Sequence, residues 1–461
     1  MNLLKKLFID DRSFYKKVLT LSLPIALQSM IAIGVNMLDT IMVGSLGEAE
    51  LSATSLANSF ISIFHIFCMG IGMGASVLIS RYWGMKSSEP EKADISLKKT
   101  ICIMLRLVTF LAALFALGTA FFPNGIMQMY DPGEQIVELG IVYLRYSIPT
   151  YFFLGLSLVC TIALRSVGQV NLPLIVSIGA FSINLAANYV LIFGKFGFPA
   201  MGVAGAALGT LISRIFETAI ICGYLIFVDK KIGFRIKHIL MKTKDLLGEY
   251  IKISIPVLVS DGILALGNNA VAMVIGRLGQ TFVAANAITS VTQQMSTVVI
   301  QGVSQSGAIV TGQTLGEGDK EKTMKQGYGF LGLGIVLGII ASACVLIISS
   351  FVIKSYNVTA ETAQTARQLM NAISIILLFQ ATNSIMTKGV LRGGGDTIML
   401  MVADNIYLWV LSIPLGIVAG FVFHMSAFWI YMALKFDQIA KAFWCVLRLR
   451  SGKWIKKIKT V

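Results

Sequence analysis

The chain has 461 residues, of which 56% are hydrophobic and 13% are charged, and its mean hydropathy is +0.79. Soluble domains carry about 25% charged residues, so a chain this apolar cannot cover a water-facing surface. The composition therefore excludes an ordinary soluble protein. Long apolar runs without alternating polarity indicate membrane-spanning helices rather than a transmembrane β-barrel.

Twelve apolar runs follow one another along the chain, and each predicts a helix long enough to cross a bilayer. We therefore expect an all-α integral membrane protein with twelve transmembrane helices in two pseudo-symmetric six-helix bundles. The approximate bounds of the runs are 17–44, 52–82, 100–122, 136–159, 166–193, 202–228, 247–276, 285–314, 327–353, 363–388, 397–423 and 425–447.

The first run recurs in the second half of the chain. Residues 22–47 align without a gap with residues 254–279, so that Pro24 recurs as Pro256, and the register continues through Gly70 and Gly302. Proline and glycine fix backbone geometry, so their shared spacing predicts two similar halves. We expect an N-terminal lobe of six helices at 1–228, a cytosolic linker at 229–245 and a C-terminal lobe of six helices at 246–461.

The net charge of +15 has an explanation in the distribution of the basic residues. An even number of spans places both ends and the even-numbered connections on one side, and most of the basic residues fall there. Such asymmetry follows the positive-inside rule, which predicts a multi-pass protein of the plasma membrane with both termini in the cytosol. It makes nucleic acid an unexpected partner, since no nucleic-acid-binding signature accompanies the charge. The main clusters are Lys5, Lys6, Arg12, Lys16 and Lys17 at the start, Lys230 to Lys244 in the linker, and Arg448 to Lys459 in the tail.

Enzymatic signatures are missing from the sequence. The six cysteines stand singly in apolar surroundings without metal-ligand spacing, and we expect them to be small core residues. The glycines at 393–395 lack the remainder of any nucleotide-binding fingerprint. We therefore expect no enzymatic activity, no cofactor and no metal beyond a possible sodium ion.

Asp39 is the strongest candidate for a functional group, because an ionisable side chain within a bilayer costs about 2.5–3.5 kcal/mol on insertion scales. Asn184 and Asn188 lie one helical turn apart in the fifth run at a similar depth, and Thr210 lies in the sixth. A carboxylate, two amides and a hydroxyl group can bind sodium or hold a proton on a buried acid. Alternatively, Asp39 lies at the headgroup level and the amides join helices.

The whole chain resembles the multidrug and toxic compound extrusion (MATE) family. The motifs are P-x14-D-T-x-M-V-G from Pro24, the Leu164–Arg165 pair before Asn184 and Asn188, GVAGAALGT ending at Thr210, VLRGGGDT at 390–397 and RLRSGKW ending at Trp454. The resemblance implies that Asp39 is the carboxylate that couples transport to protons or sodium. It also implies that Asn184, Asn188 and Thr210 line the same site.

The second half departs from the family pattern. Where some members place acids in helices seven and ten, this chain has Leu264, and Gln380 and Asn383. A second cation site is therefore in doubt. Asp261 lies one turn before Leu264, and it is a substrate counter-ion or a solvated residue of the inner vestibule. Lys435 and Asp437 are expected to pair, as are Arg214 and Glu217, and Arg145 and Asp404 are candidate cavity residues.

The second and eighth runs could supply the walls of a substrate path. Adaptable methionine and aromatic surfaces with a few amides suit varied, flat, cationic compounds, although such stripes also arise from plain helix packing. The residues concerned are Phe60, Phe64, His65 and Met69 in the second run, and Gln293, Gln294 and Gln301 in the eighth.

These features predict a secondary active transporter that exchanges protons or sodium for small organic substrates. We expect it to be a monomer surrounded by membrane lipid. The substrates are expected to be drugs and other amphipathic, often cationic, compounds. The alternative is a lipid-linked oligosaccharide flippase of related two-lobe architecture, which would need a strongly basic central cavity.

Overall fold

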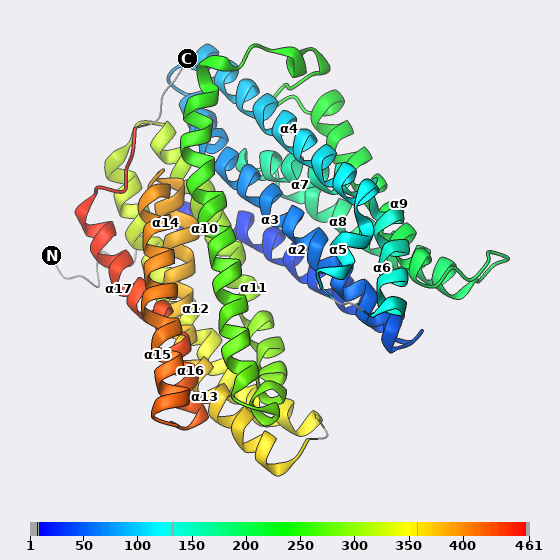
Figure 1. The fold of residues 1–461 in the computed structure, drawn as a ribbon. Coiled ribbons are helices and arrows are strands. Elements are labelled where there is room, and N and C mark those ends of the chain that lie inside the picture. The colour runs from blue at the N-terminus through cyan, green and yellow to red at the C-terminus, as the bar shows by residue number, and fades with distance from the viewer. Residues whose placement is uncertain (1–6, 8, 131–132, 357, 458–461) are drawn as a thin grey trace. The chain divides into compact units, whose positions relative to one another are not determined.

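The structure is a computed structural model of the chain (Figure 1), and it describes residue 7 and residues 9–130, 133–356 and 358–457. Lys5, Lys6 and Lys459 of the predicted basic clusters lie outside the described residues. Within these ranges the regular secondary structure is helical throughout. The all-α class predicted from the sequence is therefore confirmed.

The N-terminal half contains helices α2 to α9. Their bounds are α2 Arg12–Gly44, α3 Glu48–Met85, α4 Pro90–Phe121, α5 Pro123–Gln128, α6 Glu134–Ser147, α7 Thr150–Ser166, α8 Asn171–Phe193 and α9 Val203–Gly223, which continues as η1 Tyr224–Val228. The short helix η2, Ile236–Leu240, lies in the connection to the second half.

The C-terminal half contains helices α10 to α17. Their bounds are α10 Lys244–Arg277, α11 Gln280–Gly316, α12 Lys320–Ser355, α13 Ala360–Ser384, η3 Ile385–Leu391, α14 Thr397–Asn405, η4 Ile406–Ser412, α15 Ile413–Ile417, η5 Val418–Val422, α16 Ala427–Leu434 and α17 Phe436–Ser451.

Nine of the described helices are long and apolar enough to cross a membrane, and α6 with α7, bent by 55°, makes a tenth span if the pair is counted as one. Helix α11 and the pair α16–α17 cover the two remaining predicted spans. Helix α11 carries the glutamine-rich sequence, which lowers its mean hydropathy. The protein is thus a multi-pass membrane protein.

The described chain divides into two compact units. Unit 1 comprises the residues up to Ala26, Ser80–Glu89 and the residues from Val259 onward, and unit 2 comprises Leu27–Ile79 and Pro90–Leu258. Helices α2, α3 and α10 each pass from one unit to the other within their length. The unit borders therefore fall inside helices, whereas the predicted lobes were divided at the linker.

Within unit 1, the end of α3 crosses the end of α11 through glycines. A Cβ atom on Gly84 would overlap the backbone of Gln313, and one on Gly316 would overlap the backbone of Arg81. These two contacts exchange under the 232-residue shift of the sequence repeat. The repeated glycines therefore allow two backbones to approach more closely than any side chain would permit.

The RLRSGKW segment anchors the end of the described chain within unit 1. Trp454 is fully buried, and its indole nitrogen donates to the carbonyl of Leu449 at 3.2 Å. Arg448 binds Asp396 through two hydrogen bonds of 2.6 and 2.9 Å. The Arg81 guanidinium donates to the carbonyl of Lys456.

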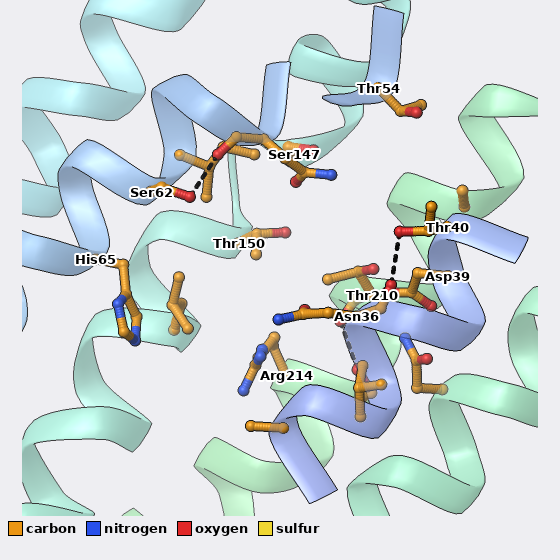
Figure 2. A pocket seen from close by; sticks show the side chains of 18 of the residues that line it. Asn36, Asp39, Thr40, Thr54, Ser62, His65, Ser147, Thr150, Thr210 and Arg214 are labelled. Atoms are coloured by element: carbon orange, nitrogen blue, oxygen red, sulfur yellow. Dashed lines mark hydrogen bonds between the residues drawn. The ribbon is translucent and has the colours of Figure 1, made fainter. Parts of the chain in front are cut away.

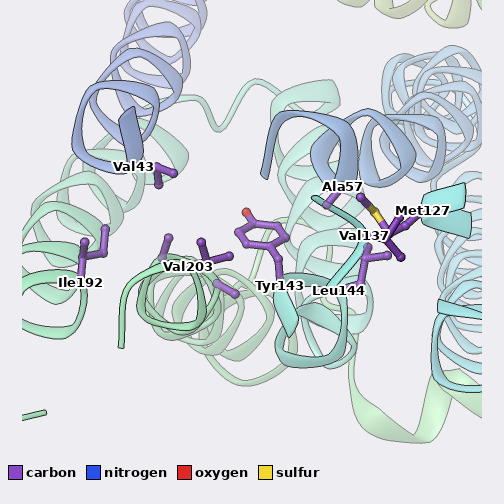
Figure 3. Packing of buried hydrophobic residues seen from close by; sticks show 10 residues of the cluster. Val43, Ala57, Met127, Val137, Tyr143, Leu144, Ile192 and Val203 are labelled. Carbon is purple, nitrogen blue, oxygen red and sulfur yellow. The ribbon is translucent and has the colours of Figure 1, made fainter. Parts of the chain in front are cut away.

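A hydrophobic cluster in unit 2 joins α2, α3, α5, α6, α8 and α9 (Figure 3). Val43, Ile192 and Val203 pack at its α2–α8–α9 side, and Met127 and Leu144 belong to its α5–α6 side. Tyr143 is a member, but its hydroxyl group donates to Asn58 Oδ1 at 3.1 Å. The cluster thus holds one end of a polar cavity in place, because Val43 and Tyr143 also line that cavity.

Four of the six cysteines are buried, as expected for small core residues. Cys344 on α12 is exposed and Cys222 is half-buried. The expectation was therefore wrong for Cys344, which lies on a membrane-spanning helix where an apolar side chain needs no protein cover.

Candidate functional site

Unit 2 encloses a cavity of about 1090 Å³ that is lined by residues of α2, α3, α6, α7, α8 and α9 (Figure 2). Fourteen of the lining side chains carry a hydroxyl group. The charged side chains are Asp39, Arg165, Arg214 and Glu217, whose formal charges cancel. Most ligand pockets are predominantly apolar, so this lining is unusually rich in hydrogen-bonding groups.

Three of the four predicted cation-coupling residues line this cavity, and the fourth, Asn188, is buried beside Asp39. Asn188 donates through Nδ2 to Asp39 Oδ1 at 2.6 Å, and through the same atom to Asn184 Oδ1 at 3.3 Å. Asp39, Asn184 and Thr210 line the cavity, and Figure 2 shows Thr210 beside Asp39. Helix periodicity explains the pairing of the two amides, because residues four apart share one face of α8.

Two polar atoms of this cluster are left over. Asn188 Oδ1 and Asn184 Nδ2 are buried and have no hydrogen-bond partner among the described residues. An unpaired buried polar atom costs about 1–3 kcal/mol, so a ligand that satisfies one of them gains that interaction. An amide oxygen, a carboxylate and a hydroxyl group together suit a hard cation such as sodium, and the carboxylate alone suits a proton. Both coupling ions therefore fit the residues present.

The other end of the cavity carries a polar network that the sequence analysis did not assign. Arg165 donates to Gln28 Oε1, with a distance of 3.0 Å from Nε, and Gln28 Nε2 donates to Ser177 Oγ at 3.0 Å. From the sequence, Arg165 entered only as part of the Leu164–Arg165 motif, without a role of its own. A signal was present, because Leu164–Arg165 recurs as Leu391–Arg392 at the corresponding helix end of the second half.

Arg214 and Glu217 form the predicted pair, with 2.6 Å between Nη1 and Oε2. Both side chains line the cavity, and the guanidinium group of Arg214 also interacts electrostatically with Asp39. Their spacing in the sequence predicted the ion pair but not its place at the cavity. Its position one helical turn from Thr210 on α9 places it inside the candidate site.

The predicted substrate-path residues of α3 divide between the cavity and the core. His65 lines the cavity, whereas Phe60, Phe64 and Met69 are absent from its wall. The ring of Phe64 packs at 5.3 Å from Phe115, and Phe60 packs at 5.4 Å from the same ring. The aromatic stripe therefore joins helices in unit 2.

Asp261 and the glutamines of α11 belong to unit 1. Asp261 accepts from Arg392 at 3.0 and 3.3 Å, so it neutralises a buried guanidinium group instead of standing alone in a vestibule. Gln293 donates to Gln380 at 2.9 Å and accepts from the Tyr431 hydroxyl group at 3.2 Å. Gln294 and Gln301 have exposed side chains.

A second charged network lies within unit 1. Lys441 is buried between Asp404 and Asp437, with Nζ–Oδ distances of 3.2 and 3.1 Å. The expected pairing of Lys435 with Asp437 was wrong, because Lys435 Nζ instead approaches Asn268 Oδ1 at 3.4 Å. Asp404 also accepts from Ser260 at 2.8 Å. Neither Asp404 nor Arg145 lines the cavity of unit 2.

Comparisons with known proteins agree with this architecture. A family model described as MatE matches residues 24–190 and 256–418. The chain is 25% identical over 462 residues to the uncharacterized transporter YisQ of Bacillus subtilis (strain 168), covering 97% of this chain and 96% of that protein. It is 25% identical over 451 residues to the probable multidrug resistance protein NorM of Thermotoga maritima, covering 96% and 93%. A solved MATE structure in the straight conformation shares the fold with a TM-score of 0.84, at 18% identity over 98% of this chain and 99% of that chain.

Proposed function

The chain belongs to the MatE family of membrane transporters, and on that premise we propose that it exports drugs and other amphipathic, often cationic, compounds in exchange for an inward-moving cation. The similarity to multidrug resistance proteins named NorM supports the substrate class. The coupling cation is a proton or sodium. The observation that carries the proposal is the hydrogen bond of 2.6 Å between Asn188 and Asp39 in a polar cavity of a membrane-spanning unit.

Asp39 gives the cavity a way to exchange one cation for another. When it is ionised, the four charged lining residues sum to zero, so a substrate cation meets no net repulsion. When Asp39 holds the coupling ion, the cavity has one excess positive charge. The coupling ion and a cationic substrate therefore oppose each other's binding, which is the thermodynamic requirement for antiport.

Neutralisation of Asp39 also changes the cost of closing the cavity. An ionised carboxylate resists transfer to a dry, low-dielectric environment, whereas a neutralised one tolerates it. Ion binding from the outer side would then permit the cavity to close and reopen inward. Substrate binding from the inner side would permit the return step, because it supplies the missing positive charge.

The flippase alternative requires a strongly basic cavity. In unit 2, Arg165 and Arg214 are balanced by Asp39 and Glu217. The lining therefore favours the antiporter over the flippase. We further propose that the transporter acts as a monomer in the plasma membrane. The distribution of its basic residues supports an orientation with both termini in the cytosol.

The direct test is efflux of a fluorescent amphipathic dye from vesicles that contain the purified protein. A sodium gradient and a pH gradient are imposed in separate experiments. We expect one gradient to drive dye transport and the other to have little effect. If the dye moves at the same rate when neither gradient is imposed, transport is not coupled to a cation and the protein is a facilitator.

A further inference from the structure

The unit 2 cavity is lined by charged side chains of both signs. They are Asp39 on α2, Arg165 on α7, and Arg214 and Glu217 on α9. Glu217 neutralises Arg214, so the cavity as a whole does not repel a cation. A guanidinium group at the wall nevertheless offers hydrogen-bond donors that a purely cationic substrate cannot use.

Arg214 has binding capacity beyond its partner. Its Nη1 atom donates to Glu217, and within the described parts of the chain Nε and Nη2 make no hydrogen bond. The side chain is 34% exposed, and Figure 2 shows it beside Asn36 and Thr210 at the cavity. A guanidinium group presents five donors and binds carboxylates and phosphates strongly. A second anionic group can thus bind without displacing Glu217.

Asp39 and Arg214 lie about one helical turn apart along the cavity wall. Thr210 lies beside Asp39, and Arg214 follows Thr210 by four residues on α9. At 1.5 Å per residue, the two positions on α9 are about 6 Å apart along the helix. A small organic zwitterion spans such a distance between its charged groups.

The neutral part of the lining suits the body of a polar molecule. Serine and threonine side chains of α3, α6 and α7 border the cavity, including Ser55, Ser59, Ser62, Ser147 and Thr150. Hydroxyl groups donate or accept as the ligand requires.

We infer that the preferred substrate is dipolar, with its cationic group at Asp39 and an anionic group, carboxylate or phosphate, at Arg214. This inference rests on the proposed function and deepens it. The cationic group competes with the coupling ion at Asp39, so antiport is retained. The anionic group accepts from the donors of Arg214 that Glu217 leaves free, which a simple organic cation cannot do.

A matched dye pair tests the inference. Rhodamine B carries a free carboxylate beside its cationic xanthene ring, and its ethyl ester lacks that negative charge. In vesicles with the driving gradient imposed, we expect kcat/KM for rhodamine B to exceed that for the ester about tenfold or more, since hydrogen bonds between charged groups are strong. Equal values, or preference for the ester, would overturn the inference.

Variants of Arg214 assign the preference to this residue. Arg214→Gln should bring the two kcat/KM values close to each other, and Arg214→Lys should retain part of the preference. Arg214→Gln with Glu217→Gln removes both charges and should behave like the single variant, which excludes an effect of an unpaired Glu217. Arg145→Gln, an exposed arginine outside the cavity of the same unit, should keep the wild-type ratio.

Two further readouts separate the inference from the proposed function. If a gradient drives export of both dyes equally, coupled transport stands and the dipolar preference fails. If neither gradient drives either dye, the proposed function fails. Fluorescence anisotropy of each dye with the purified protein then measures binding alone, and binding that is equal, or absent for both, would overturn the inference as well.

Discussion

Asn188 and Asp39 are 149 residues apart in the chain, and their side chains are joined by a hydrogen bond of 2.6 Å. The amide is 1% exposed, whereas the carboxylate borders the cavity. The bond orients the acid toward the cavity and stabilises its charged form. A coupling residue must be reachable by its ion and must also be held in one place, and this pair supplies both conditions.

Replacement of Asn188 by alanine should destabilise the ionised form of Asp39 relative to the form that holds the coupling ion. A hydrogen bond to a charged group contributes about 1.5–3 kcal/mol, so we expect the coupling-ion concentration for half-maximal efflux to shift about tenfold. The measurement is dye efflux as a function of sodium concentration or pH. Asn36→Ala provides a cavity control without a bond to Asp39, and an equal shift in that variant would contradict the assigned role.

The α3–α11 crossing predicts equal sensitivity at two distant positions. Gly84→Ala and Gly316→Ala each introduce a methyl group where backbone already lies, and overpacking of this kind costs about 1–3 kcal/mol. We expect both variants to lower the melting temperature in detergent by several degrees. Gly118→Ala on α4 faces open space and should not. Unchanged melting of both crossing variants would show that the helices do not meet as described.

Lys441 should be essential to the stability of unit 1. Its ammonium group lies between two buried carboxylates, and removing one partner of a buried ion pair costs about 3–5 kcal/mol. Lys441→Met should therefore unfold at markedly lower temperature. Adding Asp404→Asn and Asp437→Asn should recover much of the loss. Lys435→Met, whose partner is the neutral Asn268, is the matched control and should have a small effect.

The fold could be predicted from the sequence because its main signals are local. Apolar length predicted the helices. The 232-residue register of the repeat also aligns Gly84 with Gly316, which make reciprocal contacts at the α3–α11 crossing. The candidate coupling residues also carried a local signal, since one helical turn separates Asn184 from Asn188. The predicted lobe boundaries at 228 and 246 stay a prediction about the repeat, since the compact units divide α2, α3 and α10 internally.

Pairings across helices could not be predicted in the same way. Lys441 of α17 pairs with Asp404 of α14, and no local spacing in the sequence indicates that contact. The pair of Lys441 with Asp437, four residues before it on the same helix face, did carry a local signal. The aromatic stripe of Phe60 and Phe64 has the same pattern whether it faces a cavity or a neighbouring helix. Which of these applies depends on Phe115 in another helix, so tertiary packing decides it.

The connection between α9 and α10 should be sensitive to acid. His238 Nδ1 accepts from the backbone nitrogen of Arg235 at 2.9 Å, and burial, together with Lys98 and Lys237, lowers the pKa of His238. Because the folded pKa lies below the ordinary value of about 6.5, the stabilisation is complete above that pH and is lost as the pH falls through the folded pKa. Protonation would also remove the acceptor.

Limited proteolysis of this connection provides the measurement. At each pH, the cleavage rate of the wild type is compared with that of His238→Asn, whose side-chain oxygen accepts a hydrogen bond without titrating. We expect the ratio of the two rates to rise as the pH is lowered from about 7 to about 5. A ratio that stays constant would exclude His238 as the titrating group.

The central claim is that Asp39 carries the coupling ion, and gradient-driven dye efflux from vesicles containing Asp39→Asn tests it most directly. We predict that this variant folds with a melting temperature near that of the wild type but moves dye no faster than protein-free vesicles under either gradient. Glu138→Gln, which removes an exposed acid of unit 2 outside the cavity, should transport like the wild type. Gradient-driven efflux at the wild-type rate from Asp39→Asn would contradict the account.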